Sequence, residues 1–239
     1  MNKILVISDN LELVAFIQDI TQDKATYSVD YNYSAINKAP SLLKKLGMTA
    51  INVKDELTVD LILEKYDVVI SAHCKQIFPK RLVENIRCIN IHPGLNPYNR
   101  GWFPQVFSII NKLPIGCTIH EMDEEIDHGS IIYQKSVSIT PSDGSLEVYN
   151  KVLEAEKFLI SRYFDNLISG NYELVKVETE GNYNGIEDFH ALCELDLTNT
   201  ATLSEHLDLL RALTHGEFKN GYFQDGDKKY FVKLEITSE

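Results

Sequence analysis

The chain has 239 residues, which is enough for one domain of ordinary size and a small second one. Its hydrophobic fraction of 44% and charged fraction of 24% are typical of a globular protein. The net charge of -12, with no run of basic residues, disfavours contact with a phosphate backbone, so we expect no nucleic acid as a partner.

The cysteines and the apolar runs predict a soluble, cytoplasmic protein. Cys74, Cys88, Cys117 and Cys193 show no CxxC or Cys/His ligand spacing, and the last three have apolar neighbours, so we expect free thiols and no metal site. The apolar run Ile4–Ile7 is too short for the core of a signal peptide. No segment approaches the roughly 18 apolar residues of a membrane span, so no membrane partner is expected.

Short apolar strands alternate with amphipathic helices in the first part of the chain. Lys3–Ser8 has the pattern of a strand buried on both faces, and Leu11–Ile20 has the apolar spacing of a helix. The further elements are strands at 50–53, 67–71 and 88–92 and a helix at 57–65. This alternation predicts an α/β fold with a Rossmann-like, mostly parallel sheet and helices on both faces. Ligands of such sheets bind beyond the carboxyl ends of the strands, where His92 lies.

The middle of the chain continues with longer elements. We expect a helix at Pro104–Asn111, two paired strands at Ile115–Met122 and Ser130–Ile139 around an acidic loop, and a long helix at Leu146–Ile168. The long helix ends at Ser169-Gly170, because glycine is the residue that most often closes a helix.

From about residue 172 the elements become shorter and more polar. Leu203–Leu213 is predicted to be a helix, and Gly221–Gln224 and Lys229–Glu235 flank Asp225-Gly226-Asp227, which is a strong hairpin signal. We therefore divide the chain into a catalytic domain of residues 1–175 and a small C-terminal α+β module of residues 176–239.

The first motif that carries chemistry is Asn90-Ile91-His92-Pro93-Gly94. Residues two apart on a strand point to the same face, so Asn90 and His92 aim at one spot before Pro93-Gly94 turns the chain away. An amide beside an imidazole can hold a developing oxyanion and move a proton. A buried polar pair that satisfies loop backbone is an equally good interpretation of this string alone.

Two further motifs are weak by themselves. Gly116–Gly129 leads from a strand into an acidic loop that ends in Asp127-His128-Gly129, and such loops are usually solvated surface. Ser71–Pro79 follows an apolar strand and contains His73 and Lys75, which by themselves are more often surface residues at the start of a helix than site residues.

Together the three motifs resemble the signature of the formyltransferase family, whose members include methionyl-tRNA, glycinamide ribonucleotide and sugar formyltransferases. The matching residues, in order, are Asn90, His92, Gly116, Thr118, Met122, Asp123, Asp127 and Gly129. The strings Leu210–Thr214 and Gly221-Tyr222-Phe223 are similar to the C-terminal module of some members. The resemblance covers most of the chain, although Asn10–Tyr66 matches weakly.

This resemblance implies transfer of a formyl group from 10-formyltetrahydrofolate to an amine, without a metal. Asn90 would donate a hydrogen bond to the tetrahedral oxyanion, and His92 would stabilise the same oxygen or relay the amine proton. Asp127 would orient and charge-balance His92, or accept the proton through water. The cofactor-binding residues implied by the resemblance are Met122, Asp123, Glu125 and Asp127, with Phe78 and Pro79 lining the slot.

Length, charge and tail favour a sugar N-formyltransferase over enzymes acting on glycinamide ribonucleotide or methionyl-tRNA. The strings His73–Pro79 and Asn96–Pro104 resemble enzymes acting on dTDP-4-amino-4,6-dideoxyglucose, a precursor used in O-antigen biosynthesis. The substrate-binding residues implied by this likeness are His73, Lys75, Arg100 and Trp102 for the sugar or its phosphates and Tyr222 for the nucleotide.

Two alternatives stay open at this point. The first is a formyltransferase acting on another amine, namely a dTDP-3-amino sugar, glycinamide ribonucleotide or methionyl-tRNA, because the sequence does not state whether the amine is at C3 or C4. The other alternative is a non-catalytic nucleotide-binding module, although Ser8-Asp9-Asn10 stands after the first strand where a dinucleotide site would have GxGxxG.

The C-terminal hairpin predicts an interface. Its apolar residues, more numerous than a free edge should carry, are Tyr222, Phe223, Tyr230, Phe231, Val232 and Leu234. They can pack on the helix Leu203–Leu213 of the same subunit, or on a second copy. The family resemblance favours a homodimer through the C-terminal region.

Overall fold

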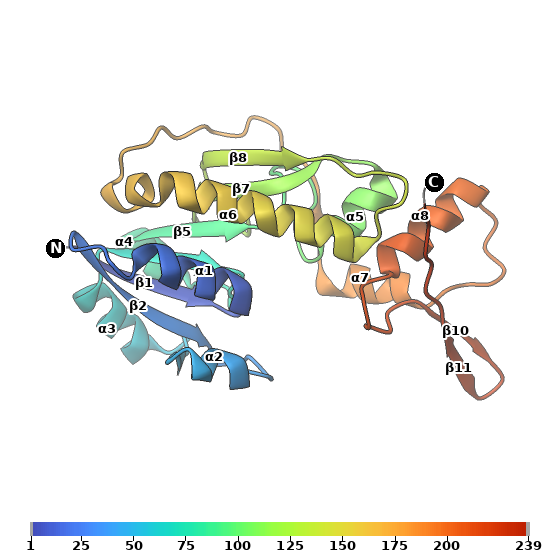
Figure 1. Cartoon of the computed structure of the whole chain (residues 1–239), viewed down its shortest axis with the longest axis horizontal. Helices are drawn as coiled ribbons and strands as arrows, with labels where there is room; N and C mark the ends of the chain where they lie inside the picture. Colours follow the sequence, from blue (N-terminus) through green and yellow to red (C-terminus); the bar gives the residue numbers. More distant parts are fainter. Residues whose placement is uncertain (1, 238–239) are drawn as a thin grey trace. The chain divides into compact units, whose positions relative to one another are not determined.

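The computed structural model describes residues 2–237 of the chain (Figure 1). Its strands are β1 (Asn2–Ser8), β2 (Tyr27–Ser34), β3 (Thr49–Ile51), β4 (Val68–Ala72), β5 (Arg87–His92), β6 (Arg100–Gly101), β7 (Ile115–Glu121), β8 (Ile131–Val137), β9 (Tyr183–Asn184), β10 (Tyr222–Asp225) and β11 (Lys228–Phe231). Its helices are α1 (Leu11–Thr21), α2 (Ser41–Lys45), α3 (Glu56–Lys65), α4 (Lys80–Asn85), α5 (Pro104–Asn111), α6 (Ser145–Ser169), α7 (Ile186–Cys193) and α8 (Leu203–Leu213).

A seven-stranded sheet forms the centre of the fold, with the strand order β3-β2-β1-β4-β5-β7-β8. The pairs from β3 to β5 are parallel, and β7 joins β5 in the antiparallel direction. The predicted α/β class with a mostly parallel sheet is therefore confirmed. The side chains of Ile4–Ile7 in β1 are 0% exposed, as expected of a central strand covered on both faces.

The chain forms two compact units among the described residues. The first consists of residues 2–92, 118–134 and 156–178, and the second of residues 93–117, 135–155 and 179–237. These units interleave along the sequence, so they are a different division from the predicted ranges 1–175 and 176–239, which stay a prediction.

Each unit has its own apolar core. In the first unit, one core joins β1, β4 and β5 to helices α3 and α4, and its buried members are Leu5, Ile7, Val53, Val59, Ile62, Val69, Phe78, Leu82 and Cys88. In the second unit, the core joins α5, α7 and α8, and its buried members include Val106, Ile109, Phe189, Cys193 and Leu213. All four cysteines are free thiols, and Cys88, Cys117 and Cys193 are buried as predicted.

The predicted helices and strands are present with small shifts of their ends. The sequence did not predict the short elements α2, α4, β6 and β9, nor the longer strand β2 and helix α7. The strand β2 contains three tyrosines and only one aliphatic residue, Val29, so it lacked the apolar run that identified its neighbours. Helix α7 is short and begins after Gly185, in the part of the chain where the sequence indicated only short, polar elements. Among residues 2–237, none of the helices combines the length and apolar composition needed to cross a bilayer.

The predicted C-terminal hairpin is present in the second unit. Strands β10 and β11 pair antiparallel with Asp225 opposite Lys228, so Gly226 and Asp227 form a two-residue turn. Gly226 has φ +58°, a left-handed conformation that suits glycine. The second strand ends at Phe231 rather than at Glu235.

Candidate active site

Two polar side chains of β5 lie near the carboxyl end of this strand, in the first unit. Ile89 and Ile91 are fully buried. Asn90 and His92 alternate with them along the strand and therefore point to its other face. The antiparallel register with β7 sets Asn90 opposite His120 and His92 opposite Thr118. The amide and the imidazole therefore lie together at the carboxyl end of β5, the last of the parallel strands.

Asp127 completes this group from the loop between β7 and β8. Its Oδ1 accepts a hydrogen bond from Asn90 Nδ2 at 2.9 Å, and its Oδ2 lies 3.4 Å from His92 Nδ1. The carboxylate is 11% exposed and His92 is 4% exposed, so their attraction is little screened by water. The structure brings together the three residues that the sequence singled out for catalysis.

His120 is a further member of this group to which the sequence analysis gave no role. Its Nδ1 lies 2.8 Å from the carbonyl oxygen of Glu121, which can only accept, so Nδ1 carries the proton. The bare Nε2 therefore accepts from Asn90 Nδ2 at 3.3 Å. Both amide hydrogens of Asn90 are then engaged, one by Asp127 and one by His120.

The acidic loop that carries Asp127 is fixed at its base. The N–H of Glu121 donates to the carbonyl of Ser130 at 3.0 Å, and the N–H of Met122 donates to the carbonyl of Cys88 at 2.8 Å. A Cβ atom on Gly129 would lie 1.7 Å from the carbonyl oxygen of Glu121, so only glycine fits at this closure. This explains the Asp-x-Gly part of the motif.

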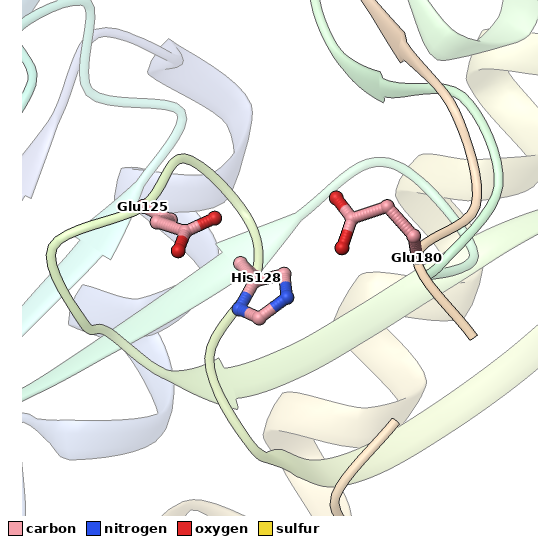
Figure 2. A group of neighbouring side chains, drawn as sticks. All are labelled: Glu125, His128 and Glu180. Carbon is pink, nitrogen blue, oxygen red and sulfur yellow. The ribbon is translucent and has the colours of Figure 1, made fainter. Parts of the chain in front are cut away.

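The predicted cofactor-binding residues have different environments. Glu125 lies on the exposed part of the acidic loop together with His128 (Figure 2). Asp123 Oδ1 accepts a hydrogen bond from the N–H of Glu125 at 3.0 Å, which shapes the tip of this loop.

Met122 and Phe78 contribute to the core instead. Phe78 is 5% exposed and packs in the core of the first unit, and Met122 packs against the same cluster. Pro79 immediately precedes α4. The cofactor contacts assigned to these three residues stay a prediction.

A second polar group lies at the carboxyl ends of β1 and β4, also in the first unit. His73 has φ +59° and contacts Asn10 and Glu156, and the side chain of Lys75 is exposed. Asp9, which the sequence analysis passed over, receives hydrogen bonds from the N–H groups of Ser34 at 3.1 Å and Lys75 at 2.8 Å. Asp9 thereby ties the loop after β4 to the end of β2.

The other predicted substrate residues belong to the second unit. Arg100 is buried, and its guanidinium pairs with the carboxylate of Glu180. The side chain of Trp102 is 42% exposed, and the backbone N–H of Trp102 donates to the carbonyl of Asn184 at 2.9 Å. Tyr222 is covered by Lys229, whose Nζ lies 3.5 Å from the ring centroid.

The α/β fold thus places an amide, an imidazole and a carboxylate together at one strand end, and groups of these types stabilise oxyanions and transfer protons in enzymes. Residues 7–163 match the sequence model of the formyl transferase family, and residues 188–238 match the N-formyltransferase dimerization C-terminal domain. The chain therefore belongs to the formyltransferase family and is an enzyme.

Full-length relatives extend this similarity over both units. A dTDP-4-amino-4,6-dideoxyglucose formyltransferase of Mycobacterium bovis is 40% identical over 237 residues, which are 99% of this chain and 97% of the relative. A sugar N-formyltransferase from a Shewanella species is 53% identical, with a TM-score of 0.98 over 100% of this chain and 99% of the other. A 4-N formyltransferase from Francisella tularensis is 45% identical, with a TM-score of 0.94 over the same shares of the two chains.

Proposed function

We propose that this enzyme transfers the formyl group of 10-formyltetrahydrofolate to the amine of a nucleotide-linked amino sugar, dTDP-4-amino-4,6-dideoxyglucose. The observation that carries this proposal is the full-length similarity to the Mycobacterium bovis enzyme, whose name states this substrate. The 4-N formyltransferase from Francisella tularensis supports the same position of the amine.

The residues around Asp127 fit a formyl donor and an amine acceptor. The donor supplies an electrophilic formyl carbon, to which the amine nitrogen of the sugar adds. The formyl oxygen gains negative charge in this addition, and the amine loses a proton. The bond from the formyl carbon to the folate nitrogen then breaks as the carbonyl forms again. An amide donor and a basic imidazole, both held by Asp127, match these two needs.

Asn90 has to release one of its engaged hydrogens to stabilise the oxygen. The longer contact, 3.3 Å to His120, is the one that it gives up, because the 2.9 Å bond to Asp127 is to a charged acceptor. Removing a donor of this kind typically lowers kcat by about 10²–10³-fold.

His92 takes the proton of the amine in this proposal. Asp127 lies beside Nδ1 and favours the proton on that nitrogen, so Nε2 is the basic nitrogen of the ring. The carboxylate also stabilises the imidazolium that forms. The proton then passes to the folate nitrogen as the leaving group departs.

We assign the substrate contacts as the sequence implied. His73, Lys75, Arg100 and Trp102 bind the sugar or its phosphates, and Tyr222 packs on the nucleotide. The folate lies against the acidic loop that carries Asp123 and Glu125. The enzyme acts in the cytoplasm, in the supply of an O-antigen-type polysaccharide.

We also propose a homodimer through the C-terminal region. Residues 188–238 match a dimerization domain, and the hairpin leaves Tyr230 and Phe231 42% and 45% exposed. A twofold contact would cover these rings in both copies. Light scattering at micromolar concentration should give twice the chain mass of 27.2 kDa, and a charged substitution such as Phe231→Glu should shift it toward one chain. A monomeric wild-type protein would refute the dimer.

Mass spectrometry of product mixtures tests the reaction. The enzyme is incubated with 10-formyltetrahydrofolate and, separately, with dTDP-4-amino-4,6-dideoxyglucose, a dTDP-3-amino sugar, glycinamide ribonucleotide and initiator methionyl-tRNA. We expect the first acceptor to gain a formyl group at least about tenfold faster than the others, because one methylene-sized misfit already changes selectivity by about 10–200-fold. Faster formylation of another acceptor, or none at all, would overturn the proposal.

A further inference from the structure

The long helix α6 buries a carboxylate that the proposed reaction does not use. In α6, all of whose residues the structure describes, Glu156 is the one buried side chain that carries a charge, and it is 0% exposed. Its neighbours on the buried face, Leu159 and Ile160, are apolar. Burial raises the pKa of the Glu156 carboxyl, and His73 opposes this shift. Removing a carboxylate from water is costly, so the presence of Glu156 at this buried position needs an explanation.

The partner of this carboxylate is His73, at the carboxyl end of β4. Glu156 Oε1 lies 2.8 Å from His73 Nε2, and Glu156 Oε2 has no hydrogen-bond partner among residues 2–237. His73 has φ +59°, a left-handed conformation that a residue with a Cβ adopts only when its surroundings hold it there. The contact between the imidazole and Glu156 thus helps to hold His73 in a strained turn.

The direction of the hydrogen bonds through His73 follows from Asn10. Asn10 Oδ1 accepts from the N–H groups of Glu12 and Leu13 at the start of α1, each at 3.0 Å, so its Nδ2 is the atom that faces His73. His73 Nδ1, 3.2 Å from this Nδ2, must therefore accept. The ring proton then lies on Nε2 and is donated to Glu156.

We propose that Glu156 is a positioning residue for the acceptor substrate. By accepting the Nε2–H of His73, it holds residues 73–76 in the turn that presents His73 and Lys75 at the carboxyl edge of the sheet. This inference rests on the proposed function, because it takes the nucleotide-linked sugar as the ligand of this turn.

The surroundings favour a role in the turn over a role in the helix. A leucine at position 156 would match the apolar face of α6 and would spare the desolvation of a charge. What leucine could not provide is an acceptor for His73. The same turn is tied a second time, by the N–H of Lys75 to Asp9 Oδ2 at 2.8 Å, so two carboxylates fix it, one on α6 and one in the loop after β1.

Two substitutions of similar volume separate the hydrogen-bond acceptor from the bulk of the side chain. E156L removes the hydrogen-bond acceptor, and E156Q keeps an oxygen that can accept from His73 Nε2–H. For E156L we expect KM for dTDP-4-amino-4,6-dideoxyglucose to rise about tenfold, with kcat and KM for 10-formyltetrahydrofolate within threefold of wild type and with thermal stability unchanged or raised. For E156Q we expect all values within threefold of wild type.

A spectroscopic measurement tests the same chain of hydrogen bonds without any substrate. The ¹⁵N shifts of His73 in the free enzyme should identify the neutral ring with its proton on Nε2. E156L should change the Nε2 shift, because the Nε2–H loses its carboxylate acceptor, whereas the tautomer set by Asn10 is kept. If wild-type enzyme does not formylate the sugar, the proposed function fails, and the Nε2 shift then decides the role of Glu156 alone.

The outcomes that overturn the inference are distinct. An unchanged KM in E156L, or an unchanged ¹⁵N shift of His73 Nε2 in E156L, removes the positioning role. Equal losses of stability and kcat in E156L and E156Q mean that Glu156 is structural. If E156L does not fold, Asn10→Ser replaces it, because serine keeps the helix cap and removes the amide donor. This variant should raise KM for the sugar at least threefold, and an unchanged KM contradicts the inference.

Discussion

Two strand ends of the same sheet each combine a histidine with a carboxylate, and they differ in what surrounds the pair. At the end of β5, Asp127 is 11% exposed and lies on a loop, 3.4 Å from His92. At the end of β4, Glu156 is 0% exposed on a helix, 2.8 Å from His73. In the proposed reaction the first pair exchanges hydrogen-bond partners, and in the proposed positioning role the second pair keeps one arrangement. The two proposals therefore differ in the burial of the carboxylate rather than in the pairing itself.

The largest expected effect lies at the end of β5. Asn90→Ala, His92→Asn and Asp127→Asn should each lower kcat by at least about 10²-fold, because each removes the oxyanion donor, the base or the group that orients the base. The fold should survive, as judged by circular dichroism and thermal unfolding. The matched substitution at the other strand end, E156Q, should keep kcat within threefold. Near-wild-type turnover of His92→Asn would remove the distinction between the two pairs.

A smaller effect is expected at His120, which connects to the first pair through Asn90. His120→Ala removes the acceptor at 3.3 Å that holds one Asn90 amide hydrogen in the free enzyme. Because Asn90 gives up this bond when it turns to the formyl oxygen, its loss spares that cost, and we expect kcat to stay within threefold of wild type. His120→Gln keeps a side-chain oxygen and should also stay within threefold. Steady-state kinetics at saturating substrates provide the comparison. A loss as large as that of His92→Asn would mean that His120 itself transfers the proton.

The smallest effect is on stability and comes from the buried carboxyl at the second strand end. Burial raises the pKa of Glu156, so the folded state binds this proton more tightly than the unfolded state does. The carboxyl therefore lowers stability progressively as the pH rises from the unfolded-state pKa through the raised folded-state pKa. We expect the free energy of unfolding of E156L, relative to wild type, to be greater at about pH 7 than at about pH 4.5. Urea unfolding at the two pH values tests this, and an identical difference at both would contradict it.

The local sequence determined the elements with strong apolar patterns and the polar residues at the end of β5. The run Ile4–Ile7 predicted a buried strand, and Asn90-x-His92 predicted two side chains on one face of another, because these patterns depend only on the geometry of a single strand. β2 was not predicted, because its tyrosines and polar residues have no apolar run of this kind.

Only the tertiary structure decided which partners these side chains meet. The antiparallel register of β7 brings His120 to Asn90 across 30 positions, and the packing of α6 brings Glu156 to His73 across 83. Periodicity describes one element at a time, so it cannot state which faces of distant elements pack together. Glu156 is the clearest example of what periodicity does not predict. Its sequence neighbours predict only an amphipathic helix, and the packing of that helix near the end of β4 brings Glu156 to His73 as a hydrogen-bond acceptor.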